Sequence, residues 1–242
     1  MIISTEAIII NARKYGDSSK IVNIFSKEQG VCSVIAKGAR NNKNKYGAAL
    51  EQLSYSYISY YYKPSSSIHL LSNAELIQSF NNIHQSLEIT ITGLMIVESI
   101  AQTQHEHSQN EELFYSAVEA LDTLNSHPLF PFSVFIRFCY NLSKILGFDI
   151  NLNTDFDRPD DVYLLFDDGF SDIRPDGNRN DFLRLNPKDF DYLKTLSGKT
   201  IDESSAMPTE NETIKSLINL FSKYFSYHLD KNIVFKSSKL LF

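Results

Sequence analysis

The chain of 242 residues has no tryptophan, two cysteines, seven prolines and nine glycines. Cys32 and Cys139 lie far apart and form no CxxC pair, so ordinary reduced thiols are the simplest interpretation. No apolar run approaches the roughly 18 residues of a membrane span. The first residues also lack the charged-then-apolar order of a signal peptide. These absences favour a cytoplasmic globular protein.

Motifs of catalysis and metal binding are missing as well. Gly198-Lys199-Thr200 is similar to the end of a phosphate-binding loop, but Leu193 stands where that loop needs a glycine. The aspartates at 155–161 lack the order of a calcium loop. His105 and His107 alternate, whereas a zinc helix places them four residues apart. No serine has a GxSxG setting, and neither cysteine has an obvious base partner. The sequence predicts no enzyme.

What the sequence does contain is an uneven distribution of charge. The net charge is −6. Residues 1–80 hold nine Lys or Arg against five Asp or Glu, a balance of +4, and the remainder holds 14 against 24, a balance of −10. If nucleic acid is a partner, it is expected to meet the N-terminal part.

A basic loop concentrates this positive charge. The run 30–36 is β-branched and alternating, which predicts a strand. The run breaks at Gly38 into a polar segment with four cations: Lys37, Arg40, Lys43 and Lys45. A polyanion is one explanation, because exposed Lys and Arg side chains displace counterions from phosphates. A solvated, asparagine-rich loop is the other, and the residues alone leave both open.

The first 80 residues read as β structure. Turn residues separate five β-prone runs, at 2–12, 21–25, 30–36, 53–62 and 68–71. No helix pattern of usual length lies between them. A domain at 1–80 with five short strands suggests a small antiparallel barrel such as the OB-fold.

The predicted fourth strand is rich in tyrosine. Tyr55, Tyr57 and Tyr61 share one face by the period of two, and Tyr60 and Tyr62 lie on the other. Exposed aromatic rings beside basic loops stack on bases in OB-folds. Aromatic residues in strands also serve cross-strand packing. Base stacking by the first three tyrosines and simple packing both remain open.

Helical periodicity begins after residue 80. A first helical part covers 81–148, with amphipathic patterns at 87–104, 111–124 and 132–146. The segment 149–186 is crowded with aspartate and contains two short β-prone pieces. Helices return in the C-terminal part, 187–242, where Asn186-Pro187 forms a cap.

The order of these parts resembles the RecO family of bacterial recombination mediators. The similarity is best from Ala36-Lys37-Gly38-Ala39-Arg40 through Lys43 and Lys45 to Gly47-Ala48-Ala49-Leu50, with Asn44 where serine is usual. Weaker similarities lie at Tyr15-Gly16-Asp17-Ser18, Val97-Glu98-Ser99, Leu146-Gly147-Phe148 and Phe235-Lys236-Ser237-Ser238-Lys239.

The resemblance implies an α+β multidomain fold: an N-terminal OB-fold barrel followed by an α-helical domain that a zinc ribbon interrupts. Where many relatives place four cysteines, the segment 149–186 has none. We therefore expect a degenerate, zinc-ribbon-like acidic segment with no metal or other cofactor. Its folding would then depend on packing of four side chains: Tyr163, Leu165, Phe170 and Phe182.

The resemblance further implies a non-enzymatic mediator of DNA repair. Such a protein binds single- and double-stranded DNA, anneals complementary strands, and helps to load the RecA recombinase together with RecR. It also recognises the tail of single-stranded DNA-binding protein, for which the helices would supply an apolar groove rimmed by Arg137, Lys144 or Lys215. A cytoplasmic, nucleoid-associated location follows.

In this interpretation Arg13, Lys14 and Lys20 join the four loop cations as phosphate contacts that carry no base code. The alternative function is an OB-fold adaptor that binds a partner protein and touches DNA little. The acidic balance favours the adaptor, and the charge asymmetry favours DNA.

Overall fold

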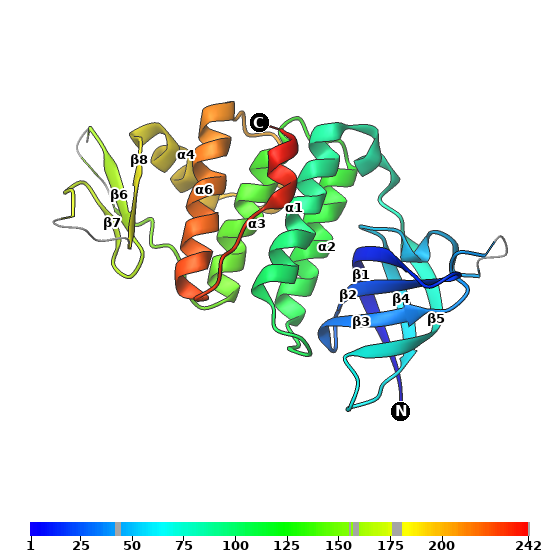
Figure 1. The fold of residues 1–242 in the computed structure, drawn as a ribbon. Coiled ribbons are helices and arrows are strands. Elements are labelled where there is room, and N and C mark those ends of the chain that lie inside the picture. Colours follow the sequence, from blue (N-terminus) through cyan, green and yellow to red (C-terminus); the bar gives the residue numbers. More distant parts are fainter. Residues whose placement is uncertain (42–44, 155, 157–159, 176–180, 242) are drawn as a thin grey trace.

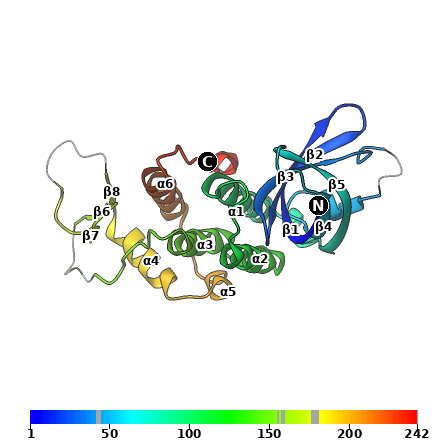
Figure 2. The same ribbon diagram turned by 90° about the horizontal axis from the view of Figure 1, so that it is seen from below.

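The computed structural model describes residues 1–41, 45–154, 156, 160–175 and 181–241. Figures 1 and 2 show three parts in a row: a β-barrel, a bundle of helices, and a small β-sheet at the opposite end. The N-terminus lies on the barrel, and the C-terminus lies beside the bundle (Figure 2). In the part of the chain that the structure describes, none of the helices has the length and apolarity that crossing a membrane requires.

The barrel is closed and has the strand order β1-β2-β3-β5-β4, with β3 and β5 parallel and the other neighbours antiparallel. The predicted OB-type barrel is therefore confirmed. The fifth strand extends to Gln78, beyond the predicted 68–71. The prediction was too short because the outward side chains Asn73 and Glu75 are polar and interrupt the apolar pattern. The elements are β1 (Ile2–Tyr15), β2 (Ser19–Ser26), β3 (Gly30–Ala36), the 3-10 turn η1 (Gly47–Leu50), β4 (Tyr55–Tyr61) and β5 (Ile68–Gln78).

An isoleucine run in β1 joins the barrel to the bundle. Ile9 belongs to the barrel interior, and Ile8 and Ile10 belong to the core that the bundle shares. A strand covered on both faces is expected to carry a continuous apolar run. Phe114 completes the contact, since its ring lies 5.7 Å from that of Phe25. Burial of large apolar side chains on both sides holds the two parts together.

The loop between the first two long helices is also fixed to the barrel. The backbone N–H of His107 donates to the carbonyl oxygen of Val31 at 3.1 Å. Gly30 has a φ of +64°, and a Cβ at this position would lie 2.1 Å from the carbonyl oxygen of Ser108. Glycine is required here both by the left-handed backbone and by the close approach.

The bundle follows the predicted periodicity, with each end set by local chemistry. The side chain of Asn110 accepts from the backbone of Leu113 at the start of one helix, and Pro131 opens the next. The helical elements are η2 (Asn81–Gln85), α1 (Leu87–Thr103), α2 (Glu111–Asn125), α3 (Pro131–Ile145), α4 (Pro187–Ser197), α5 (Ile201–Ser204), α6 (Asn211–His228) and η3 (Lys236–Leu240).

The acidic segment forms a three-stranded antiparallel sheet in the order β7-β6-β8, from β6 (Val162–Leu165), β7 (Gly169–Ser171) and β8 (Phe182–Leu185). Its core face was predicted only in part. Phe170 does pack on the bundle side, where its ring lies 4.7 Å from that of Phe190. Tyr163 and Phe182 instead pair on the other face, 6.1 Å apart. The buried face carries Val162, Leu164, Phe166 and Leu185.

The described residues of this segment do not fit a zinc ion. Structural zinc needs about four Cys or His ligands around one point, and the described chain has no group of three or more His, Cys, Asp or Glu side chains able to hold a metal. Period two fixes which residues share a face and does not say which face is covered, so the sequence did not separate Phe170 from the Tyr163–Phe182 pair. Apolar contacts with α4 and α6 take the place that ligands would have.

Candidate nucleic-acid interface

The hairpin between β1 and β2 places three cations at one end of the barrel. Lys14 lies directly opposite Lys20 in the ladder, and Arg13 lies opposite Ile21. Ala12 lies opposite Val22, whose side chain is in the barrel interior, so Ala12 faces the same side. Lys14 is two residues further along the strand and therefore points toward the mouth of the barrel. Arg13, one residue earlier, points to the outside.

The loop after β3 returns to this same hairpin. The backbone N–H of Arg40 donates to the carbonyl oxygen of Ser18 at 2.9 Å, and its guanidinium donates to that of Gly16 at 2.9 Å. Lys37 follows Ala36, which pairs with Lys20. The structure thus brings together five predicted cations that are separated along the chain: Arg13, Lys14, Lys20, Lys37 and Arg40.

The remaining two loop cations differ from these five. The ammonium of Lys45 donates to the carbonyl oxygen of Ser72 in β5 at 3.0 Å and lies 4.8 Å from the centre of the Tyr46 ring. Its side chain is therefore directed along the barrel, away from the hairpin. Lys43 lies outside the described residues.

Most of the gathered charge is available to a ligand. Arg13, Lys14 and Lys37 are exposed, and no ion pair involves them within the described part of the chain. The Arg40 guanidinium is bonded to Gly16, and Lys20 pairs with Glu51 at 3.3 Å. Glu51 is well exposed, and an ion pair with a solvated partner contributes about 1 kcal/mol or less, so a phosphate can compete for Lys20.

The three tyrosines of β4 share a face, as predicted, but have different surroundings. The ring of Tyr55 lies 6.0 Å from that of Phe114, and its hydroxyl donates to Glu6, so it belongs to the contact between barrel and bundle. Burial and the Glu6 carboxylate raise the pKa of the Tyr55 hydroxyl above its ordinary range. The structure thus separates Tyr55 from the two exposed tyrosines.

Tyr57 and Tyr61 are 44% and 48% exposed. Tyr57 lies between Glu6 and Glu75 on the neighbouring strands, whereas Tyr61 lies between Ile2 and Leu70. Two flanking carboxylates repel a phosphate backbone, and two flanking aliphatic side chains do not. Of the two, only Tyr61 has surroundings suited to a base.

Sequence reasoning missed an aromatic residue in the middle of the cations. Tyr15 is 53% exposed at the end of β1. It shares the outer face with Arg13 by the period of two. Its place directly after Arg13-Lys14 is a usable signal, because single-strand sites combine cations with exposed rings.

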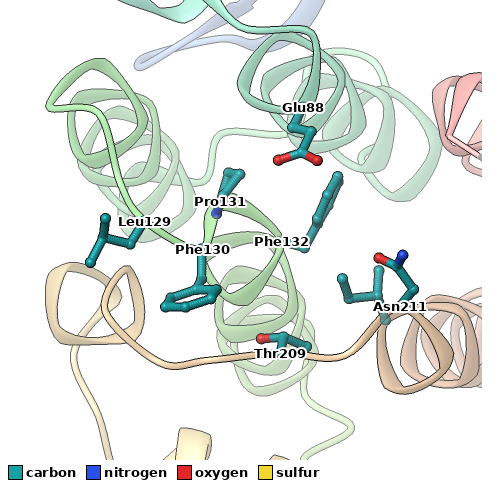
Figure 3. Close-up of a pocket in the computed structure, with 8 residues that line it drawn as sticks. Glu88, Leu129, Phe130, Pro131, Phe132, Thr209 and Asn211 are labelled. Atoms are coloured by element: carbon teal, nitrogen blue, oxygen red, sulfur yellow. The ribbon is translucent and has the colours of Figure 1, made fainter.

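The bundle carries a small pocket of about 90 Å³ (Figure 3). It lies at the start of α3 and is lined by Glu88, Leu129, Phe130, Pro131, Phe132, Thr209, Asn211 and Ile214. Of the predicted rim cations, Arg137 donates instead to the carbonyl oxygen of Lys199 at 2.5 Å, and Lys144 lies over the Tyr140 ring at 4.6 Å. Neither lines the pocket; Lys215 is exposed beside Ile214.

The fold and the cationic hairpin define the class of the protein. OB-type barrels bind oligonucleotides or oligosaccharides on the face of strands 2 and 3 and on the loops that join strands 1 to 2 and 4 to 5. The cations gather around the first of these loops. This is an OB-barrel protein with an attached helical bundle and a cluster of cations at one end of its barrel.

Comparison with known protein families identifies the family of this chain. The model of the recombination protein O N-terminal region matches residues 1–80, and the model of its C-terminal region matches residues 84–238. The chain therefore belongs to the recombination protein O (RecO) family, and the resemblance drawn from its sequence is confirmed.

Curated relatives agree with this assignment. The chain is 36% identical over 124 residues to the DNA repair protein RecO of Salinibacter ruber, an alignment that covers 51% of this chain and 48% of that protein. It is 26% identical over 256 residues to the DNA repair protein RecO of Prosthecochloris aestuarii, an alignment that covers 100% of this chain and 97% of that protein. With the DNA repair protein RecO of Christiangramia forsetii it shares 25% identity over 232 residues, which cover 95% of this chain and 93% of that protein.

Proposed function

We propose that this protein is a DNA-repair recombination mediator that binds single- and double-stranded DNA through phosphate contacts at the cationic end of its barrel. The gathering of Arg13, Lys14, Lys20, Lys37 and Arg40 around one loop, in a chain of net charge −6, carries the proposal. Isolated cations on the surface of an acidic protein do not by themselves indicate a ligand. Five cations that converge from three segments can together displace counterions from the phosphates of a nucleic acid.

Membership of the RecO family extends the proposal to partners. The protein would act with RecR, recognise the tail of single-stranded DNA-binding protein, anneal strands and help to load RecA, without catalysing a reaction and in association with the nucleoid. An acidic tail with an apolar end fits the pocket at the start of α3 only in its apolar part, because Glu88 lines that pocket.

The adaptor alternative also has an observation in its favour. Beyond the hairpin, the outer face of β4 presents Tyr57 between Glu6 and Glu75, and such a face suits a protein better than a phosphate backbone. A partner protein could occupy it whether or not DNA binds at the hairpin.

Fluorescence anisotropy with two single-stranded oligonucleotides of unrelated sequence separates the two functions. A mediator is expected to bind both oligonucleotides about equally. Its affinity is expected to fall steeply between 50 mM and 200 mM salt, since each phosphate contact adds about 0.7 to the slope of log affinity against log salt. Absence of salt-sensitive binding would favour the adaptor. Co-elution with RecR then tests the partner.

A further inference from the structure

The C-terminal segment is tied to α1 by side chains of that helix. Gln102 accepts from the backbone N–H of Val234 at 3.0 Å and donates to its carbonyl oxygen at 3.0 Å. One turn earlier, the carboxylate of Glu98 accepts from the backbone N–H of Ser237 at 3.1 Å and from its hydroxyl at 2.9 Å. Phe235 is buried, with its ring 5.1 Å from that of Phe135. These contacts fix the position of η3.

Two lysines of η3 take no part in this anchoring. Lys236 and Lys239 are exposed, and no hydrogen bond or ion pair is found for either side chain within the residues that the structure describes. A 3-10 helix has three residues per turn, so side chains at positions i and i+3 lie one above the other. The segment therefore presents two aligned, unpaired cations from a rigid base.

A cleft of about 300 Å³ separates Lys236 from the barrel. Asn11 and Gln52 line its barrel side, and Glu98, Gln102 and Lys236 line its bundle side. Figure 2 shows η3 at the C-terminus on the same side of the molecule as the hairpin of β1 and β2. Asn11 shares the outer face of β1 with Arg13 and Tyr15, at steps of about 7 Å along the strand. A row of outward side chains thus leads from the hairpin to the cleft.

We propose that this cleft is a second contact point for a single-stranded nucleic acid, in which Lys236 and Lys239 bind phosphates of a strand that leaves the hairpin along β1. The proposal rests on the proposed DNA-binding function of the barrel. Asn11 supplies a neutral polar group beside the strand, while the amides of Gln52 and Gln102 donate to the backbone of Ile10 and Val234 and add no charge to the lining. Glu98 is the one carboxylate in the lining, and both of its oxygens already accept hydrogen bonds from Ser237.

An acidic protein segment is the other ligand that two lysines could attract. Ile10, Val97 and Ala101 line the cleft together with the polar side chains, so the lining alone suits either ligand. A nucleic acid is favoured because the cleft lies in line with Arg13 and Tyr15, which combine a cation with an exposed ring. A single strand needs both of these features, whereas an acidic peptide has no use for the ring.

The test compares the double variant Lys236→Ala/Lys239→Ala with the control Lys188→Ala/Lys223→Ala. All four lysines are exposed, and the control pair lies on α4 and α6, away from the barrel (Figure 1). Both variants lose the same charge. With single-stranded DNA, the η3 variant is expected to flatten the salt slope by about 1 to 1.5, since two phosphate contacts are lost at about 0.7 each. The control is expected to keep the wild-type slope.

Circular dichroism and the thermal midpoint confirm that both variants are folded, as is usual for exposed lysines. If the wild type binds DNA in a salt-sensitive way and both variants have the same slope, the proposal of a second contact point at the cleft is contradicted. The proposed DNA-binding function of the barrel is unaffected by that result. Loss of binding to poly-glutamate in the η3 variant with an unchanged DNA slope would likewise overturn the second contact point, in favour of an acidic protein partner. A wild type without salt-sensitive DNA binding would contradict the proposed function itself.

Discussion

At the scale of single residues, the neighbours of a side chain decide its function more than its type does. Tyr15, Tyr57 and Tyr61 are all exposed tyrosines at strand positions. Tyr15 lies next to the paired cations Lys14 and Lys20, and of the three only Tyr57 has a carboxylate on either side. Type and period two could be read from the sequence. Strand register could not, because pairing depends on contacts between distant segments.

Replacing Tyr15 by alanine is expected to weaken single-stranded DNA binding by about 1 to 3 kcal/mol, the usual value for loss of one stacked base. The same change at Tyr57 is expected to leave affinity unaltered, because Glu6 and Glu75 keep phosphates away. Titration of a labelled oligonucleotide against both variants measures the difference. Equal losses at the two positions would contradict the assignment of Tyr15.

His69 is a second residue whose behaviour depends on its surroundings. It is 1% exposed and stacks on Tyr60 with ring centres 5.4 Å apart. Its Nδ1 accepts from the backbone N–H of Lys63 at 3.4 Å, and its Nε2 has no partner among the described residues. Burial, with a smaller contribution from His107, lowers the pKa of His69 below its ordinary value of 6.5.

A lowered pKa in the folded state has a definite sign for stability. The unfolded chain takes up a proton at His69 below about pH 6.5, and the folded chain resists it, so stability is full above that pH and falls as the pH drops further. Urea unfolding at pH 7.5 and 5.5 is expected to show a smaller loss of stability for His69→Phe, which keeps the ring and removes the titration. An identical pH dependence in the variant and the wild type would contradict this account.

At the scale of elements, the docking of the 105–108 loop on the β2–β3 hairpin explains why residue 30 is a glycine. Gly30→Ala is expected to lower the unfolding free energy by about 2 kcal/mol or more, through left-handed backbone strain and contact with Ser108. Gly16→Ala is the matched control. Gly16 has a φ of +56° with no atom within 4 Å of a built Cβ, so only the strain remains. Equal losses in denaturant unfolding would show that the close contact adds nothing.

The small sheet gives another prediction at this scale. Apolar packing of Leu164, Phe166 and Phe170 against the bundle is expected to hold β6, β7 and β8 without metal. A chelator should therefore leave the thermal midpoint unchanged, and elemental analysis should find no zinc in proportion to protein. A drop in the midpoint on chelation, reversed by added zinc, would contradict this.

At the scale of the whole molecule, the order of parts could be predicted from the sequence, whereas the direction that each loop cation takes could not. Alternation in β1 to β4 and helical periodicity after residue 80 are local properties, and they were sufficient for the barrel and the bundle. That Arg40 bonds to the hairpin at Gly16, while Lys45 turns to Ser72, depends on loop geometry that no local pattern records. The anchoring of η3 by Glu98 and Gln102 joins segments more than one hundred residues apart for the same reason.

The central claim is that the cations at the end of the barrel bind phosphates, and the salt dependence of single-stranded DNA affinity tests it most directly. With Arg13, Lys14, Lys37 and Arg40 replaced together by alanine, the slope of log affinity against log salt is expected to flatten by about 2 to 3. The loss should be similar for unrelated DNA sequences, because phosphate contacts carry no base code. An unchanged slope in a folded quadruple variant would contradict the claim.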